Sequence, residues 1–329
     1  GEARWKSRSL PGSCLFAYPA VLHFHRLLGD YVQIVEVCAI LTADRRGVQQ
    51  VQTAQWRVGR HGKGPVFCMG SLPGAIPQWV YLLVCFIVGT FLGSFVGVLT
   101  SRIPRDQQWI RGRSVCVSCG HELGMLDLVP IWSYVFLRGR CRYCHAPIGA
   151  RTLWVEVVTG LLLVGIGWRF GWSLTAVKFA VMTVLALAVG VIDFETGLVP
   201  DALVLPGAAM GIAFGALGGW AGVLSALGGA AIGAVLFALI ILLSRGGMGW
   251  GDATLGLMLG AFLGWQLAIV FLMLAFIIGA CAGVVLMLFF KKKGKDSMPF
   301  GPAMAVGAYI TALVGNNLTG WYLATFFRR

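Results

Sequence analysis

Long apolar segments that carry almost no charge restrict the fold of this chain more than any other feature of its sequence. Most of them approach the roughly 20 residues that a helix needs to cross a bilayer. They run over 79–100, 153–168, 174–192, 202–219, 222–243, 253–264, 267–290 and 302–326. The sixth is the shortest, which suits a short or broken helix that lines a cavity. We therefore predict an all-α polytopic membrane protein with about eight transmembrane helices.

Composition and the placement of charge also indicate a membrane protein. Charged residues are 12% of the chain and apolar residues 58%, whereas soluble domains carry about 25% charged residues. The net charge of +13 would suit a nucleic-acid-binding protein, but eight arginines and only three acids gather between Ser101 and Arg151. The positive-inside rule assigns such a loop to the cytoplasm, which places both chain ends outside. We expect a lipid bilayer as a partner and no nucleic acid.

Two aspartates stand at the edges of the third and sixth apolar segments. Asp193 lies in Ile-Asp-Phe-Glu-Thr-Gly-Leu-Val-Pro-Asp, and Asp252 ends Gly-Met-Gly-Trp-Gly-Asp. A carboxylate at the membrane edge is costly and usually functional. The predicted topology brings both to one membrane face, where two carboxylates that cannot both stay ionised suit acid/base hydrolysis of a peptide. Gly249 and Gly251 remove side chains beside Asp252, so that a substrate backbone can approach; an ordinary interhelical loop is the alternative.

The loop between the first and second segments carries two C-x-x-C pairs, 21 residues apart. Their members are Cys116, Cys119, Cys141 and Cys144. This spacing is close to that of four-cysteine zinc sites, although a redox dithiol or incidental cysteines are alternatives. A loop of this size cannot bury a large core, so we expect the zinc to be structural. His121 and His145 follow the pairs closely, and we interpret them as bystanders.

Three other acids are candidates for lesser roles. Glu156 lies at the membrane edge of the second segment, where it is either functional or an anchor that pairs with Arg151 or Arg102. Asp201 is expected to cap the fourth helix, because it follows a proline at the start of that segment. Glu195 is expected to be a solvated charge.

The first 68 residues differ from the rest of the chain. They show no sustained helical or strand periodicity, and no methionine precedes Met69. We expect 1–68 to be an upstream extension, non-native or disordered, followed by a first span over 69–100. The alternative is a genuine extension with a helix around 31–42.

Several motifs occur in an order that resembles one family. They are Gly93-Ser94-Phe95, Arg102-Ile103-Pro104, the two cysteine pairs, Val155-Glu156, the segment 192–201, Gly249-Trp250-Gly251-Asp252 and Pro299-Phe300-Gly301-Pro302. Over 69–329 the chain is similar to bifunctional prepilin peptidases, the bacterial leader peptidases and N-methyltransferases of type IV pilus and type II secretion systems. Gly-x-Gly-Asp with an upstream aspartate is the most specific motif, shared with presenilin-like intramembrane aspartyl proteases. Gly97 and Thr254 depart from the family, which often has asparagine and lysine there.

This resemblance implies an aspartic endopeptidase in the bacterial inner membrane, with its active site facing the cytoplasm. Asp193 and Asp252 would cleave type IV prepilins or type II secretion pseudopilins after the glycine that ends a short basic leader. S-adenosylmethionine would then serve methylation of the new N-terminal residue, with no binding residues indicated. The resemblance further implies that 101–151 is a methyltransferase-associated zinc loop and 152–329 the peptidase domain.

Three alternatives stay open. Methylation rests on the resemblance, so a peptidase without it is possible. A membrane transporter would also use intramembrane aspartates, but no second copy of either aspartate motif suggests internal repeats. A non-enzymatic assembly factor that docks through the zinc loop would leave both aspartates unexplained.

Overall fold

The computed structural model describes two short strands and four longer stretches of the chain. The longer stretches are 77–108, 113–243, 249–290 and 299–326. Internal contacts divide the chain into two units, Gly1–Pro77 and Gln78–Arg329, and each unit is described by itself.

A small hairpin is the described part of the first unit. Strand β1 (Cys38–Ala43) pairs antiparallel with β2 (Gln49–Ala54). Val51 and Thr53 alternate with glutamines in β2, a pattern that suits a two-stranded ladder. The hairpin departs from the all-α prediction, and a helix around 31–42 is wrong for the last part of that range, where β1 runs. Residues 31–37 lie outside the described residues.

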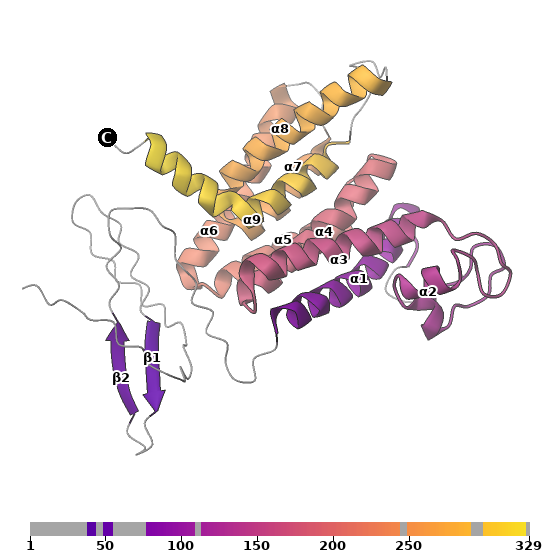
Figure 1. Ribbon diagram of the computed structural model, residues 1–329. Coiled ribbons are helices and arrows are strands. Elements are labelled where there is room, and N and C mark those ends of the chain that lie inside the picture. Colours follow the sequence, from indigo (N-terminus) through magenta and orange to yellow (C-terminus); the bar gives the residue numbers. More distant parts are fainter. Residues whose placement is uncertain are drawn as a thin grey trace, which may run out of the picture. The chain divides into compact units, whose positions relative to one another are not determined.

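Apolar helices dominate the second unit (Figure 1). The long ones are α1 (Gln78–Arg102), α3 (Ala150–Phe170), α4 (Leu174–Thr196), α5 (Asp201–Ala216), α6 (Gly219–Leu243), α7 (Trp250–Leu263), α8 (Trp265–Phe290) and α9 (Gly301–Phe326). A short helix, α2 (Trp132–Phe136), lies in the loop between α1 and α3. Each predicted apolar segment coincides with one long helix to within four residues at either end.

Five of these helices are long and apolar enough to cross a membrane, by length and composition and within the described residues. They are α1, α3, α4, α6 and α8, whereas α5 and α7 are shorter apolar helices. The structure thus confirms helices in all eight apolar segments and membrane-spanning length in five. A crossing by all eight stays a prediction.

Local capping fixes the ends of α4 and the start of α5. The Ser173 side chain accepts a hydrogen bond from the Ala176 N–H at 3.1 Å, and α4 stops at Gly197, whose φ of +68° is left-handed. Such a left-handed glycine is a frequent helix stop. The predicted N-cap role of Asp201 is wrong, because Pro200 is the N-cap and Asp201 lies in the first helical turn. An acid there still interacts favourably with the helix dipole.

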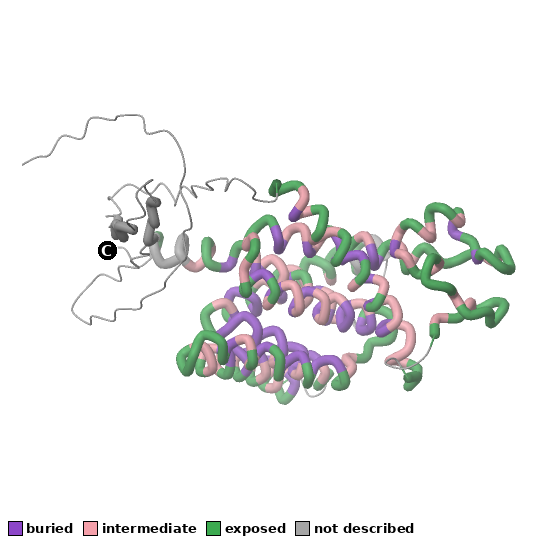
Figure 2. The backbone as a smooth tube through the Cα atoms, turned by 90° about the horizontal axis from the view of Figure 1, so that it is seen from below, coloured by how far each residue is buried: buried purple, intermediate pink, exposed green. Residues whose placement is uncertain are grey.

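Helix α4 lies in the middle of the unit and contacts α1, α3, α5, α7 and α9. Figure 2 shows the buried residues along the helix faces that meet, and a mostly exposed loop between α1 and α3. Helices α6 and α7 approach most closely at facing glycines, where a Cβ on Gly229 would collide with the Gly260 carbonyl and one on Gly233 with the Gly256 carbonyl. Small residues at such crossings let helix backbones touch.

Candidate active site

Asp193 lies in the last turn of α4, almost completely buried, with 5% of its surface exposed. Its Oδ2 accepts a hydrogen bond from the Gly301 N–H at 2.7 Å. That amide begins α9, where the first N–H groups of a helix have no partner within the helix. A Cβ on residue 301 would lie 2.6 Å from Oδ2, so the carboxylate fills the space that glycine leaves.

Asp252 lies in the first turn of α7 and is 8% exposed. Its carboxylate has the Gly249 N–H as a hydrogen-bond partner, which is the side-chain half of a capping box. The carboxylates of Asp193 and Asp252 are close enough for their charges to interact. The structure therefore brings together two aspartates that are 59 residues apart in the sequence.

The glycines before Asp252 have local structural roles. Gly249 is the N-cap of α7 and has an extended backbone. A Cβ on Gly251 would lie 2.6 Å from the Cβ of Val199, so this glycine lets α7 pack against the connection between α4 and α5. The Thr254 hydroxyl donates to the Gly251 carbonyl at 3.0 Å. Close packing therefore accounts for Gly251 without a substrate.

Buried neighbouring carboxyl groups have a defined chemical capability. Desolvation and mutual repulsion favour a state in which one carboxyl keeps its proton while the other is ionised. The ionised group can accept a proton from water, and the protonated group can donate one. Gly301, which the sequence showed only as part of a motif, is the backbone donor to one member of this pair.

The four loop cysteines converge on one point. Their sulfur atoms all lie within 4.8 Å of one another, and Cys116 Sγ is 3.8 Å from Cys144 Sγ. Four sulfurs at 2.3 Å from a tetrahedral metal would be separated by about 3.8 Å. The donor set and its spacing therefore fit a four-coordinate metal ion of the zinc type.

The two cysteine pairs are structurally equivalent. The residue after each second cysteine, Gly120 or His145, has a left-handed backbone, and its N–H donates to the carbonyl of the first cysteine of its pair. Each first cysteine in turn donates its N–H to a carbonyl five residues later, His121 or Ala146. Each position in the second pair lies 25 residues after its equivalent in the first. The sequence does not reveal this repeat, because only the cysteines recur as the same residue type.

The local backbone also favours a thiolate at Cys116. The N–H groups of Cys119 and Ser118 point at Cys116 Sγ and lower the pKa of that thiol to about 6. A thiolate is the form that binds metal. The His121 ring packs against the Tyr143 ring at a tilt of 38°, with centroids 3.7 Å apart. The described residues that could hold a metal here are the four cysteines, without either histidine.

Glu156 anchors the loop to the helices. It is buried in α3, 5% exposed, and its Oε2 accepts a hydrogen bond from the Ile131 N–H at 2.8 Å. Ser94 of α1 is a second hydrogen-bond partner. Ile131 has φ +61° and ψ −53°, and the Trp132 N–H donates to the Pro130 carbonyl across it, which makes a γ-turn. This conformation is strained for a β-branched residue, so Glu156 stabilises a turn that the chain alone disfavours.

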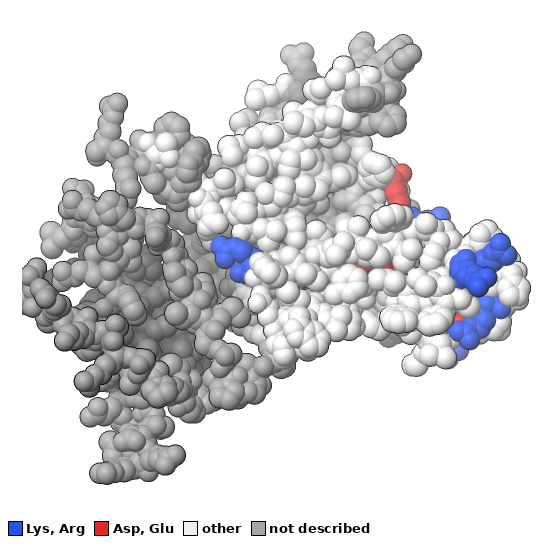
Figure 3. Space-filling view, in the orientation of Figure 1, with Lys and Arg blue, Asp and Glu red and all other residues white. Residues whose placement is uncertain are grey.

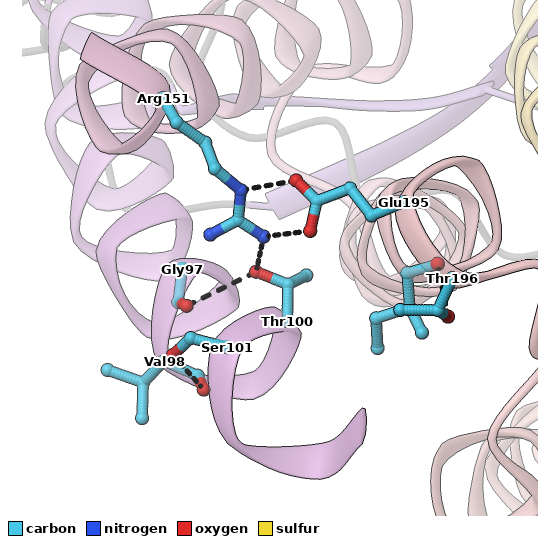
Figure 4. Close-up of polar contacts among 8 residues, drawn as sticks. Gly97, Val98, Thr100, Ser101, Arg151, Glu195 and Thr196 are labelled. Carbon is cyan, nitrogen blue, oxygen red and sulfur yellow. Dashed lines mark hydrogen bonds and ion pairs between the residues drawn. The ribbon is translucent and has the colours of Figure 1, made fainter. Parts of the chain in front are cut away.

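Arg151 pairs with Glu195 and not with Glu156, so the predicted pairing of Glu156 with Arg151 is wrong, and Glu156 forms no ion pair with Arg102 among the described residues. Glu195 is exposed, as expected for a solvated charge, but it is ion-paired. Figure 4 shows the guanidinium of Arg151, at the start of α3, pointing at both oxygens of Glu195 on α4. The second of these contacts is 2.7 Å, and the same guanidinium donates to the Thr100 hydroxyl of α1 at 2.9 Å. The cluster ties three helices together two residues from Asp193.

The loop is also the most basic described surface in view. Figure 3 shows lysine and arginine atoms gathered at the end of the helical unit where this loop lies. Two of its three acids, Glu122 and Asp127, pair with Arg113 at 2.5 Å and Arg142 at 2.7 Å.

Comparisons with known proteins cover both parts of the helical unit. Residues 87–170 match the bacterial peptidase A24 N-terminal domain, and residues 179–284 match the type IV leader peptidase family. No solved structure shows significant similarity.

Several curated relatives carry the name prepilin leader peptidase/N-methyltransferase. One from Aeromonas hydrophila is 33% identical over 279 residues, which cover 75% of this chain and 96% of the relative. One from Pseudomonas aeruginosa is 31% identical over 271 residues, or 74% of this chain and 93% of the relative. One from Burkholderia pseudomallei is 34% identical over 280 residues, or 76% and 89%.

The apolar helices and the paired buried aspartates define a class, that of helical membrane proteins with a two-aspartate site. Within that class, the matched domains and the extent of the similarity settle the family. The chain belongs to the type IV leader peptidase family.

Proposed function

We propose that this protein cleaves the leader peptide of type IV prepilins and N-methylates the new N-terminal residue. The observation that carries the proposal is the pair of buried, interacting carboxyl groups of Asp193 and Asp252 in a chain of this family. The names of the relatives support both activities. Type II secretion pseudopilins, which share this processing by resemblance, are included among the proposed substrates.

For the cleavage step we assign the acid and base roles to the two aspartates. The ionised member takes a proton from a water molecule, which attacks the carbonyl carbon after the leader's glycine. The protonated member donates to the carbonyl oxygen and then to the leaving amine. The Gly301 N–H holds one oxygen of Asp193, which leaves the other free to face water and substrate. No covalent intermediate is needed.

For the loop we propose a structural zinc held by Cys116, Cys119, Cys141 and Cys144. Four thiolates fill a tetrahedral site, so no position is left for a substrate. S-adenosylmethionine would supply the methyl group in the second activity. We assign no residue to its binding, and we place that activity with the loop 101–151 because the family resemblance does so.

We further propose that all eight long helices cross the bacterial inner membrane. The arginine-rich loop then lies in the cytoplasm, and so does the opening of the aspartate site, because α4 ends and α7 begins at the same side as the loop. The peptidase domain is 152–329, and residues 1–68 lie outside the catalytic unit.

Co-expression with a prepilin tests these assignments. We expect a gel to show leader removal, and mass spectrometry of the product to show an N-terminal residue heavier by one methyl group. A chain that begins at Met69 is expected to do both. Cleavage without the methyl group would reduce the proposal to a peptidase, an intact prepilin would contradict it, and inactivity of the shorter chain would give 1–68 a role.

A further inference from the structure

An exposed apolar patch on the loop has no assigned role. It combines the 3-10 segment Met125–Leu128 with the adjoining helix α2, and the two segments contact each other. The members of this α2 patch are Met125, Leu126, Trp132, Val135 and Phe136, which are 60–90% exposed. The rings of Trp132 and Phe136 stack with centroids 5.5 Å apart. Clustered exposed side chains of this kind indicate an interaction surface.

The patch lies beside the ends of two apolar helices and not far out in the loop. Glu156, which binds the N–H of Ile131 immediately before α2, is the seventh residue of α3. At 1.5 Å per residue, the Glu156 Cα lies about 9 Å inside the end of α3, and its side chain leans back toward that end, so the start of α2 lies within this depth. Figure 1 shows α2 next to that end of α1 and α3. Trp154, at the same level of α3, is 67% exposed.

Residues at this level face a particular chemical environment. If α1 and α3 cross a bilayer, a depth of this order from the helix ends is the interface of headgroups and acyl chains, where tryptophan is enriched. Phenylalanine, methionine and leucine beside it add apolar area that lipid can bury.

The charges next to the patch favour one kind of lipid. Arg138 and Arg140 follow α2 directly, are exposed, and form no ion pair with another described residue. The nearby acids Glu122 and Asp127 are already paired. The basic side chains are therefore available for anionic headgroups.

We propose that the α2 patch docks into the anionic lipid surface, with Trp132 and Phe136 in the interface and Arg138 and Arg140 on the headgroups. The inference rests on the proposed membrane crossing of α1 and α3, but not on either enzymatic activity. Glu156 positions the patch through the Ile131 amide. As a consequence, the metal-binding loop is held against the membrane beside the helix ends and does not move freely in solution.

Photo-crosslinking of the full chain in lipid nanodiscs tests the proposal. p-Benzoylphenylalanine replaces Phe136 in one variant and Ser118, on the exposed first cysteine pair, in a matched control. We expect intact-mass analysis to show a phospholipid adduct at position 136 and little at position 118. Labelling in phosphatidylglycerol should exceed that in phosphatidylcholine about thirtyfold, the effect of two basic residues near an anionic surface.

A further variant separates the contribution of the two arginines from that of the apolar side chains. Arg138→Gln with Arg140→Gln, in the position-136 background, should remove the preference for phosphatidylglycerol but keep the adduct. An unchanged zinc content reports that the loop remains folded in each variant. Adducts to a second copy of the chain or to an added prepilin would identify a protein surface and overturn the proposal, as would no adduct at all. Equal labelling in both lipids would overturn the anionic part.

Discussion

Gly301 has no room for a side chain, because the Asp193 carboxylate occupies the adjacent space. We predict that Gly301→Ala displaces that carboxylate and lowers the rate of leader cleavage by about a hundredfold, the effect of a misplacement of about 1 Å at a catalytic group. Gly149→Ala is the matched control, since a Cβ there meets nothing within 4 Å. Initial rates in membranes measure both, and an active Gly301→Ala enzyme would separate Asp193 from the chemistry.

Glu156 is expected to act on the loop and not on cleavage. Glu156→Leu leaves the Ile131 N–H without its acceptor, at a cost of about 1–3 kcal/mol, whereas Glu156→Gln retains an acceptor oxygen. Hydrogen exchange at the Ile131 amide should accelerate in the leucine variant alone, with cleavage retained. If both variants exchanged like the parent, the hydrogen bond would not hold the turn.

At the scale of elements, the cluster of Arg151, Glu195 and Thr100 joins α3, α4 and α1. The ion-paired side chains are 38% and 36% exposed, so their contribution to the free energy of unfolding is at most about 1 kcal/mol. We expect the ion pair to affect mainly the position of Asp193, because Glu195 and Asp193 share the last turn of α4. We predict that Arg151→Glu lowers cleavage roughly tenfold, in line with sensitivity to small displacements.

The charge-swapped enzyme decides whether this effect is electrostatic. Arg151→Glu combined with Glu195→Arg should recover most of the lost cleavage, while Glu195→Arg by itself should resemble Arg151→Glu. A double variant as slow as the singles would mean that the pair has no positioning role.

The cysteine cluster is expected to serve the second activity more than the first. Cys119→Ser or Cys144→Ser removes one thiolate of four, and should release the metal and lower methylation more than cleavage, since the aspartates lie on other elements. Cys281→Ser, at an exposed cysteine of α8, is the control. Zinc analysis and the methylated fraction of the cleaved pilin report the result. Full methylation by protein without zinc would show that the cysteine cluster is not needed for methylation.

Much of the helical architecture could be predicted from the sequence, because apolar length and the scarcity of charge determine where membrane helices run. The contacts of single side chains were harder to predict wherever the partner residue is distant in the sequence. Glu195 and Arg151 are 44 residues apart, and Asp193 and Gly301 are 108 apart. Neither pairing leaves a local pattern. Asp201 was wrong as an N-cap because α5 begins at Asp201 itself, one residue earlier than a capping aspartate implies. The hairpin was missed because the alternation is confined to Val51 and Thr53 of β2, and β1 shows none.

At the scale of the whole molecule, α4, α7 and α9 together place two carboxyl groups side by side. The loop contributes the proposed metal site and, through α2, the proposed surface for lipid. We propose that the cleavage chemistry depends on the helices alone. A test of the two aspartates is therefore the most direct test of the proposed function.

That test measures leader cleavage by Asp193→Asn, Asp252→Asn and the double variant. Amides are nearly isosteric with carboxyl groups but cannot transfer the proton, so we predict that each single variant inserts normally and loses cleavage by at least about a thousandfold. The double variant should lose little more than either single one, because the pair works as a unit. Both single variants should still methylate a pilin that has already been cut. Substantial turnover by either asparagine variant would contradict the assignment of the acid/base pair to these two residues.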